Sequence, residues 1–132
     1  MTFLLEIATP ERLLIREQVT EAQIPAAEGY IGVLPQHAPL LSELGIGELS
    51  YQVGGKRHSL VVGGGWIEVL PEHTRVLASS AERVDEIDLA RAEVALKRAK
   101  ERLEKTPGGM DIGRALNSLR RAKARLEAAK HG

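Results

Sequence analysis

Apolar and polar residues alternate in short runs through the first part of the chain. The apolar members of the two clearest runs are Phe3, Leu5 and Ile7, followed later by Leu49, Tyr51 and Val53. The polar residues Glu48, Ser50 and Gln52 alternate with the members of the second run. Because successive side chains of a β-strand point to opposite faces, this period of two predicts strands with one buried face and one face in water.

Glycine and proline separate these runs and predict hairpins. Gly54-Gly55 follows the second run directly, and such a pair adopts the positive φ angles of a two-residue turn into a strand over Lys56–Val62. Further along, Trp66–Leu70 and Thr74–Ala78 are predicted to be two strands joined by a turn at Pro71–His73. Many short antiparallel strands at this spacing predict a β-sandwich or flattened barrel.

The hydrophobic period changes in the last third of the chain. Leu and Ala recur at alternating spacings of three and four residues, in two stripes: Leu89, Ala92, Leu96, Ala99 and Leu103, then Ala115, Leu119, Ala122, Leu126 and Ala129. This spacing predicts one apolar stripe on each of two helices. Thr106–Gly109 is expected to end the first helix and Asp111 to cap the second, which gives an antiparallel two-helix hairpin. Alanine buries little area, so the hairpin is expected to be only modestly stable by itself.

Charge and turn residues divide the chain at the same place. The 132 residues include 18 Lys and Arg and 18 Asp and Glu, yet residues 1–82 carry 5 basic and 10 acidic residues, while residues 83–132 carry 13 and 8. Nine of the 13 glycines and five of the six prolines also precede residue 83. We therefore predict a β-sandwich domain over residues 1–83 and a helical hairpin over residues 84–132.

Residues for chemistry are sparse. The chain has no cysteine, which excludes disulfides and thiolate metal sites and favours a protein of the cytoplasmic side. Its histidines, His37, His58, His73 and His131, show no metal-ligand spacing, so no metal site is expected. Gly63–Gly65 matches no phosphate-binding motif and favours a bulge or a close approach of two backbones. No catalytic arrangement stands out, and no apolar run is long enough for membrane insertion.

The segment Glu28–Leu41 follows neither hydrophobic period. Glycines, prolines and large apolar residues alternate in it, which predicts a structured loop. Exposed apolar residues in such a loop would form a contact surface, whereas buried ones would make it a crossover packed on the core. The pattern alone leaves both interpretations open.

This segment and three others resemble a known family. The residues concerned are Glu28-Gly29-x-x-Gly32-x-x-Pro35-x-His37-Ala38-Pro39-Leu40-Leu41, Gly64-Gly65-x-x-Glu68-Val69, Val76-Leu77-Ala78 and Ile87-Asp88-x-x-Arg91-Ala92. In this order, over essentially the whole chain, they closely resemble the epsilon subunit of bacterial F-type ATP synthases. The resemblance implies a non-catalytic subunit of the rotor's central stalk, peripheral at the cytoplasmic face of the bacterial inner membrane. The enzyme concerned makes ATP from ADP and phosphate using a transmembrane proton gradient.

The resemblance also implies roles for the segment Glu28–Leu41. The sandwich of this family binds the gamma subunit and the c-ring, and this end of the sandwich lies near both. Glu28, Tyr30 and His37 thereby become candidate contact residues. The candidates for shaping the loop are Gly29, Gly32, Pro35 and Pro39.

The family's hairpin implies regulation of ATP hydrolysis, because it either folds against the sandwich or extends along gamma to the catalytic beta and alpha subunits. No cofactor is required, but ATP becomes a candidate regulatory ligand, since in some members it steadies the folded hairpin. The positions that match their ATP site are Glu82, Ile87, Asp88, Arg91, Ala92, Arg98, Arg121 and Arg125. The two arginines of each helix in this set are spaced by seven or four residues, so each pair shares a face. The glycine-rich connection Pro107–Gly113 departs from the pattern and puts the register of the two pairs in doubt.

A free-standing cytosolic ATP-sensing module is the alternative function, since it would use the same arginines without an ATP synthase. A nucleic-acid-binding protein would explain the basic C-terminal part. However, residues 83–132 contain no aromatic residue and interleave 8 acidic with 13 basic residues, which suits phosphate tracking poorly. We therefore expect no nucleic acid partner.

Overall fold

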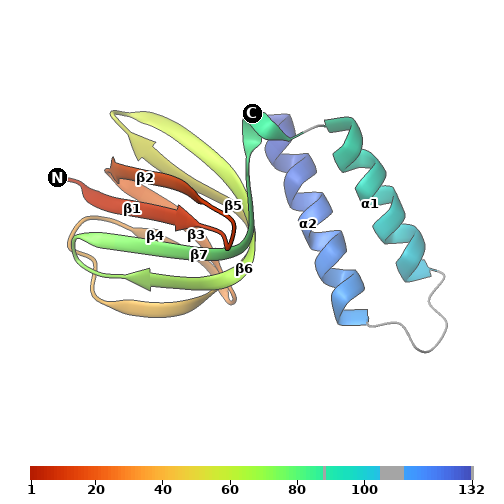
Figure 1. The fold of residues 1–132 in the computed structure, drawn as a ribbon, viewed down its shortest axis with the longest axis horizontal. Helices are drawn as coiled ribbons and strands as arrows, with labels where there is room; N and C mark the ends of the chain where they lie inside the picture. The colour runs from red at the N-terminus through yellow and green to blue at the C-terminus, as the bar shows by residue number, and fades with distance from the viewer. Residues whose placement is uncertain (88, 105–111, 132) are drawn as a thin grey trace.

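Seven strands form the N-terminal body of the molecule and a pair of helices follows it (Figure 1). The computed structural model describes residues 1–87, 89–104 and 112–131. Its strands are β1 (Phe3–Ala8), β2 (Leu13–Val19), β3 (Glu21–Ala26), β4 (Gly29–Val33), β5 (Leu40–Val53), β6 (Lys56–Val69) and β7 (His73–Arg83). The helices are the 3-10 helix η1 (Val84–Glu86), α1 (Leu89–Glu104) and α2 (Ile112–His131). The predicted fold class, a β-sandwich followed by an antiparallel two-helix hairpin, is confirmed.

One sheet runs through all seven strands and folds over on itself to make the sandwich. The hydrogen-bonded order is β2-β1-β7-β6-β5-β3-β4, with β1 and β7 parallel and the other neighbours antiparallel. β5 and β6 have 14 residues each, well above the usual strand length of about 5–6. The prediction of two strands over Lys56–Val62 and Trp66–Leu70 is therefore corrected, because β6 runs unbroken from Lys56 to Val69.

The side chains of β6 that face the core are at even-numbered positions before the bend in this strand and at odd-numbered positions after it. Its core residues are Leu60 and Val62 before the bend and Ile67 and Val69 after it. Gly63–Gly65 lies between them, with φ angles of +70° at Gly64 and +130° at Gly65. Side-chain-bearing residues rarely adopt such angles. The glycines therefore let β6 exchange its inner face for its outer face while it stays paired with β5 and β7.

Gly65 also lies too close to β7 to carry a side chain. A Cβ atom at this position would collide with the carbonyl oxygen of Leu77. The close approach of two backbones predicted for Gly63–Gly65 is thus confirmed. The predicted hairpin turn at Gly54-Gly55 is confirmed as well, with φ angles of +57° and +81°.

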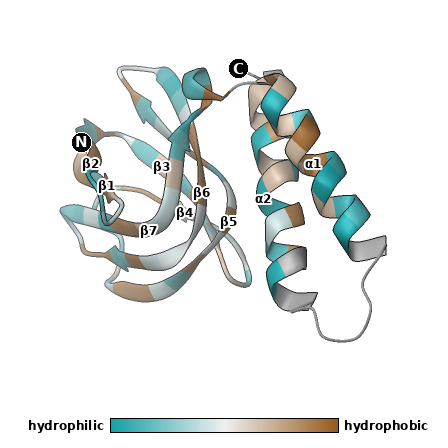
Figure 2. Ribbon diagram, turned by 45° about the vertical axis from the view of Figure 1, so that its right-hand side comes forward, coloured by the Kyte–Doolittle hydropathy of each residue, from teal (hydrophilic) through white to brown (hydrophobic). Residues whose placement is uncertain are grey.

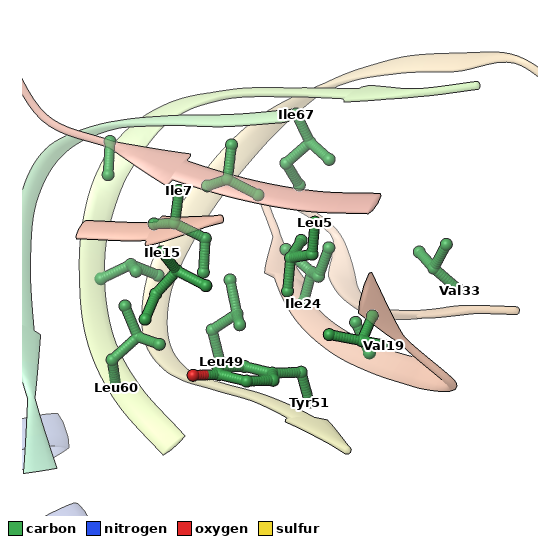
Figure 3. Packing of buried hydrophobic residues seen from close by; sticks show 14 of the residues in the cluster. Leu5, Ile7, Ile15, Val19, Ile24, Val33, Leu49, Tyr51, Leu60 and Ile67 are labelled. Atoms are coloured by element: carbon green, nitrogen blue, oxygen red, sulfur yellow. The ribbon is translucent and has the colours of Figure 1, made fainter. Parts of the chain in front are cut away.

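The core fills the space between the two layers of the folded sheet (Figure 3). The residues of the two predicted runs that are buried in it are Phe3, Leu5, Ile7, Leu49 and Tyr51. The prediction that Ser50 faces water is wrong, because this residue is only 6% exposed. Ser50 points away from the core, but α2 packs against β5 and β6 and covers their outer face.

In the hairpin, α2 lies between the sheet and α1 (Figure 2). Among the helical side chains that the structure describes, the buried ones are Ala92, Ala99, Ala122 and Ala128. Three of these alanines belong to the predicted stripes. Leu89 does not follow the prediction and is 43% exposed, because it begins α1 and borders a surface hollow. The predicted break at Thr106–Gly109 and the cap Asp111 lie outside the described residues.

The glycine at the bend provides a test of the fold. Gly65→Ala is expected to cost about 3 kcal/mol or more of unfolding free energy, because its methyl group has no room. Gly54→Ala is the matched control, since a Cβ at Gly54 meets nothing within 4 Å and only the left-handed backbone costs about 1 kcal/mol. Urea denaturation of both variants measures the difference, and equal costs would contradict the close approach.

Candidate functional site

A pocket of about 480 Å³ lies between the hairpin and the outer face of the sheet. The sheet contributes Val61, Ser80 and Glu82 to it. Val61 pairs with Glu82 across β6 and β7, so both side chains leave the sheet on the side that faces α2. The pocket therefore exists only while the hairpin is docked.

An ion pair joins the hairpin to the sheet at this pocket. Nε of Arg125 in α2 lies 2.8 Å from Oε1 of Glu82 in β7, and Nη2 lies 3.3 Å from Oε2. The two side chains are 29% and 34% exposed. This two-pronged geometry is the strong form of an arginine–carboxylate contact.

Arg121 lies one turn before Arg125 on the same face of α2. Its Nη2 donates a hydrogen bond to Oγ of Ser118 at 3.2 Å. The stem of Arg121 packs over Gly63, where a Cβ would lie 3.2 Å from its Cδ. Gly63 thus leaves the space in which the arginine side chain lies against the sheet.

The first helix supplies further cations. Arg98 and Arg102 line the same pocket. Arg91 lines an adjoining hollow of about 440 Å³, which Arg98 and Arg125 also border. Among the described residues that line the main pocket, four are arginines and one, Glu82, is acidic. This arginine pocket is therefore suited to a ligand with several negative charges.

The structure brings together only part of the predicted ATP set. Glu82, Arg98, Arg121 and Arg125 share the arginine pocket, and Arg91 lies beside it. Ile87 lines a different hollow, Ala92 is fully buried, and Asp88 lies outside the described residues. Sequence reasoning missed Arg102, although its spacing of four from Arg98 places both on one helix face. It also missed Ser80 and Ser118, for which the sequence holds no comparable signal.

The segment Glu28–Leu41 is less of a loop than the sequence predicts. Gly29–Val33 is strand β4 and Leu40 begins β5, so the connecting loop comprises residues 34–39. β4 pairs with β3 at the edge of the sheet, whereas Leu40 and Leu41 pair with Val69 and Glu68 of β6. Both Pro35 and Pro39 fall within the loop, whereas Gly29 and Gly32 belong to β4.

The three candidate contact residues differ in their surroundings. Glu28 is exposed in the turn between β3 and β4. Tyr30 is 58% exposed, but its hydroxyl accepts a hydrogen bond from the Glu48 N–H at 3.2 Å. His37 is half-buried, and its Nδ1 lies 2.6 Å from the carbonyl oxygen of Ala38. Glu28 and Tyr30 are therefore accessible to a partner, and Tyr30 also has a role within the sandwich.

A further exposed surface was missed by sequence reasoning. Trp66 and Leu77 face each other across β6 and β7 and are 52% and 51% exposed. Leu41, on the neighbouring strand β5, is 69% exposed. We call Leu41, Trp66 and Leu77 the apolar face. The sequence indicates this surface by apolar residues at strand positions that face outward. Trp66 is such a residue, since it is exposed and its neighbour Ile67 is buried.

Comparison with known proteins places this architecture in one family. Residues 2–84 match the family model of the ATP synthase delta/epsilon chain β-sandwich domain, and residues 85–130 match that of its long α-helix domain. The ATP synthase epsilon chain of Solibacter usitatus is 57% identical over 110 residues, which are 83% of this chain and 82% of the relative. The epsilon chain of Koribacter versatilis is 48% identical over 103 residues, 78% and 72% of the two chains.

A solved structure agrees with these relatives. A chain of the Euglena gracilis mitochondrial ATP synthase, from an assembly of OSCP, F1 and c-ring, superposes with a TM-score of 0.86 at 26% identity. The similarity covers 98% of this chain and 82% of the Euglena chain. The fold and the docked hairpin thus define a two-domain subunit of a rotary ATPase. The chain belongs to the ATP synthase epsilon chain family, the non-catalytic subunits of the central stalk of F-type ATP synthases. Among the helical residues described, no helix is long and apolar enough to cross a membrane.

The ion pair at the arginine pocket yields a prediction. A double-mutant cycle with Glu82→Gln and Arg125→Gln is expected to give a coupling energy of about 1 kcal/mol, the upper part of the range for partly exposed pairs. The measurement is urea denaturation monitored by the circular dichroism of the helices. Arg120→Gln combined with Glu82→Gln is the control, because Arg120 is exposed on the same helix and its cycle should show no coupling. Equal coupling in both cycles would contradict a specific contact.

Proposed function

We propose that the sandwich joins the gamma subunit to the c-ring and that the hairpin regulates ATP hydrolysis by the catalytic beta and alpha subunits. The subunit would work at the cytoplasmic face of the bacterial inner membrane, in an ATP synthase driven by protons. The single observation that carries this proposal is a contrast in packing. The sandwich has a core of large aliphatic residues, whereas the fully buried side chains in the described part of the hairpin are alanines, and the ion pair Glu82–Arg125 joins that part to the sheet.

The sandwich offers surfaces for assembly at its end away from the hairpin. The loop 34–39 lies at this end, because the Gln36 N–H donates to the carbonyl oxygen of Pro71 in the turn between β6 and β7. That turn is far from the helices in Figure 1. The apolar face lies on strands β5, β6 and β7 between this turn and the bend. Exposed large apolar side chains gathered on one face are typical of protein interfaces, which supports contacts with gamma and the c-ring here.

Regulation needs two arrangements of the hairpin with similar free energies. In the described part of the hairpin only alanines are fully buried, Leu96, Leu119 and Leu126 are half-buried, and the ion pair with Glu82 is partly exposed, so the advantage of the docked arrangement over an extended one is modest. Residues 83–132 carry 13 basic and 8 acidic residues. Once extended, these basic helices would meet an acidic segment of a catalytic subunit.

ATP is the proposed regulatory ligand of the arginine pocket. Its phosphates would be held by Arg98, Arg121 and Arg125, which come from both helices and share the pocket only in the docked hairpin. A ligand that needs both helices favours this arrangement by its difference in affinity for the two. Arg125 already forms an ion pair with Glu82. ATP must therefore either share this guanidinium with the carboxylate or displace the carboxylate.

The division of labour between the domains predicts the behaviour of a shortened chain. A variant ending at Val84 should keep the sandwich core, since every residue of the core cluster precedes Val84. We expect it to bind gamma like the full chain and to lose control of ATP hydrolysis. A pull-down with gamma and a hydrolysis assay of the reconstituted synthase measure the two properties. Loss of gamma binding by a folded variant, or unchanged control of hydrolysis, would contradict the proposal.

Calorimetric titration with ATP tests the regulatory ligand. The wild type should bind ATP, and Arg121→Ala/Arg125→Ala should weaken binding about tenfold or more, because charge-assisted contacts are lost. Arg120→Ala/Lys123→Ala serves as the control, because it removes the same two charges from exposed positions of α2. The absence of binding to wild type at millimolar ATP, or equal affinities of the double variant and wild type, would leave these arginines as partner-facing charges.

A further inference from the structure

Gly63 stands in β6 at a position whose backbone does not require a glycine. Its φ angle is not positive, unlike the φ angles of Gly64 and Gly65 that follow it. A residue with a side chain can adopt such a backbone, and a glycine within a strand costs conformational entropy and offers no side chain for packing. The reason for a glycine at position 63 therefore lies in the space above the sheet.

The space above Gly63 lies between two side chains of the face that α2 covers. Gly63 pairs with Ile46 of β5 on one side and with Ser80 of β7 on the other, and residues paired in this way point to the same face of a sheet. A Cβ atom at Gly63 would lie 2.8 Å from Oγ of Ser80 and 3.2 Å from Cδ of Arg121 in α2. We call the gap at Gly63, between Ile46 and Ser80, the notch.

Arg121 fills the notch with the apolar stem of its side chain. Its Cδ and Cγ are the atoms that approach Gly63, whereas Nη2 donates a hydrogen bond to Oγ of Ser118 in the same helix. A long cationic side chain commonly covers apolar surface with its methylene stem while its charged end stays in water. The contact of this stem with the sheet is therefore steric, and it depends on the empty space at Gly63.

The notch lies one step away from the ion pair that joins α2 to the sheet. Arg121 and Arg125 are four residues apart, which is about 6 Å along a helix. Ser80 beside the notch and Glu82 in the ion pair are two residues apart on β7, which is about 6.6 Å along a strand. One turn of α2 therefore matches the distance between the notch and the ion pair. The depth of the notch limits how closely α2 approaches the sheet where Arg125 meets Glu82.

We infer that Gly63 is a positioning residue that sets the balance between the docked and the extended hairpin, because a side chain at this position would lift α2 off the sheet. The inference rests on the proposed function only in that the hairpin has two arrangements. Lifting α2 moves Arg125 away from Glu82 and weakens the packing of the helix on β5 and β6. Because the docked arrangement has only a modest advantage, such a loss shifts molecules to the extended one.

Spin labels measure this balance in the isolated full chain without ATP. The chain has no cysteine, so Glu72→Cys in the turn between β6 and β7 and Lys97→Cys on α1 introduce the two labels at exposed positions. Gly63→Val should lower the ratio of docked to extended molecules about tenfold, with a smaller effect for Gly63→Ala. Ser79→Val is the matched control, because it places the same side chain on β7 outside the arginine pocket and should leave the ratio unchanged.

Removal of the Arg121 side chain tests whether the notch acts through the stem of this residue. Arg121→Ala leaves room above position 63, so Gly63→Val/Arg121→Ala should have a larger docked fraction than Gly63→Val. Three results would overturn the inference. They are an unchanged docked fraction in Gly63→Val, an effect of the same size in Ser79→Val, and equal docked fractions in Gly63→Val and the double variant.

Urea denaturation separates this role from a role in the stability of the sandwich. Trp66 is the single tryptophan of the chain and lies in β6, so its fluorescence follows the unfolding of the sandwich. The denaturation midpoint of Gly63→Val should stay at the wild-type value or rise, because valine favours strands. Gly65→Ala should lower the midpoint, since its methyl group would meet the backbone of β7. An equally low midpoint for Gly63→Val would overturn the inference.

The reconstituted synthase tests the link between the notch and regulation. Gly63→Val should alter the rate of ATP hydrolysis, because it changes the fraction of molecules with an extended hairpin. The labels detect the arrangement of the hairpin without the synthase, so the two claims can fail separately. Unchanged hydrolysis by a variant whose labels show an extended hairpin would contradict the proposed regulatory function, while the label distances would still support the role of Gly63.

Discussion

Alanine has a single methyl group to bury, and alanines are the helical residues that are buried in the described part of the hairpin. At about 25 cal/mol for each Å² of apolar surface removed from water, such small side chains contribute little docking free energy. Among the larger side chains, Leu89, Val94 and Leu116 remain exposed, and Leu96, Leu119 and Leu126 are only half-buried. The sandwich is built in the opposite way, around large aliphatic residues such as Leu5, Ile24 and Ile67. The two parts of the chain therefore differ in how firmly they are held.

Because apolar burial holds the hairpin only weakly, polar contacts at its base gain influence over its position. Arg125 and Glu82 form a two-pronged ion pair beside a pocket lined by three further arginines. An anion that enters this pocket changes the partners of the same guanidinium that fixes α2 to β7. A modest ligand affinity is sufficient to shift such a balance.

The strands and helices could be predicted from the sequence because their hydrophobic periods are regular. Phe3, Leu5 and Ile7 follow the strand period, and the spacing of Ala92 and Ala99 follows the helical one. The bend of β6 breaks the strand period at Gly63–Gly65, so the period predicts two strands where one continuous strand runs and does not assign Trp66 to the exposed face. The arginine pairs of the pocket follow from helical spacing. Their meeting with Glu82, and the burial of Ser50, depend on the docking of α2, which no local pattern records.

Native-state hydrogen exchange of the isolated full chain measures directly how much more weakly the hairpin is held than the sandwich. Two classes of amides are expected, because regions with few buried apolar contacts open locally at a lower free energy. Amides of α1 and α2 should exchange at a free energy well below that of the core strands β1, β5 and β6. Arg125→Gln should lower the exchange free energy of the helical amides and leave that of the strand amides unchanged. A single class, in which the helices exchange only by global unfolding of the sandwich, would show that the hairpin is held as firmly as the sandwich.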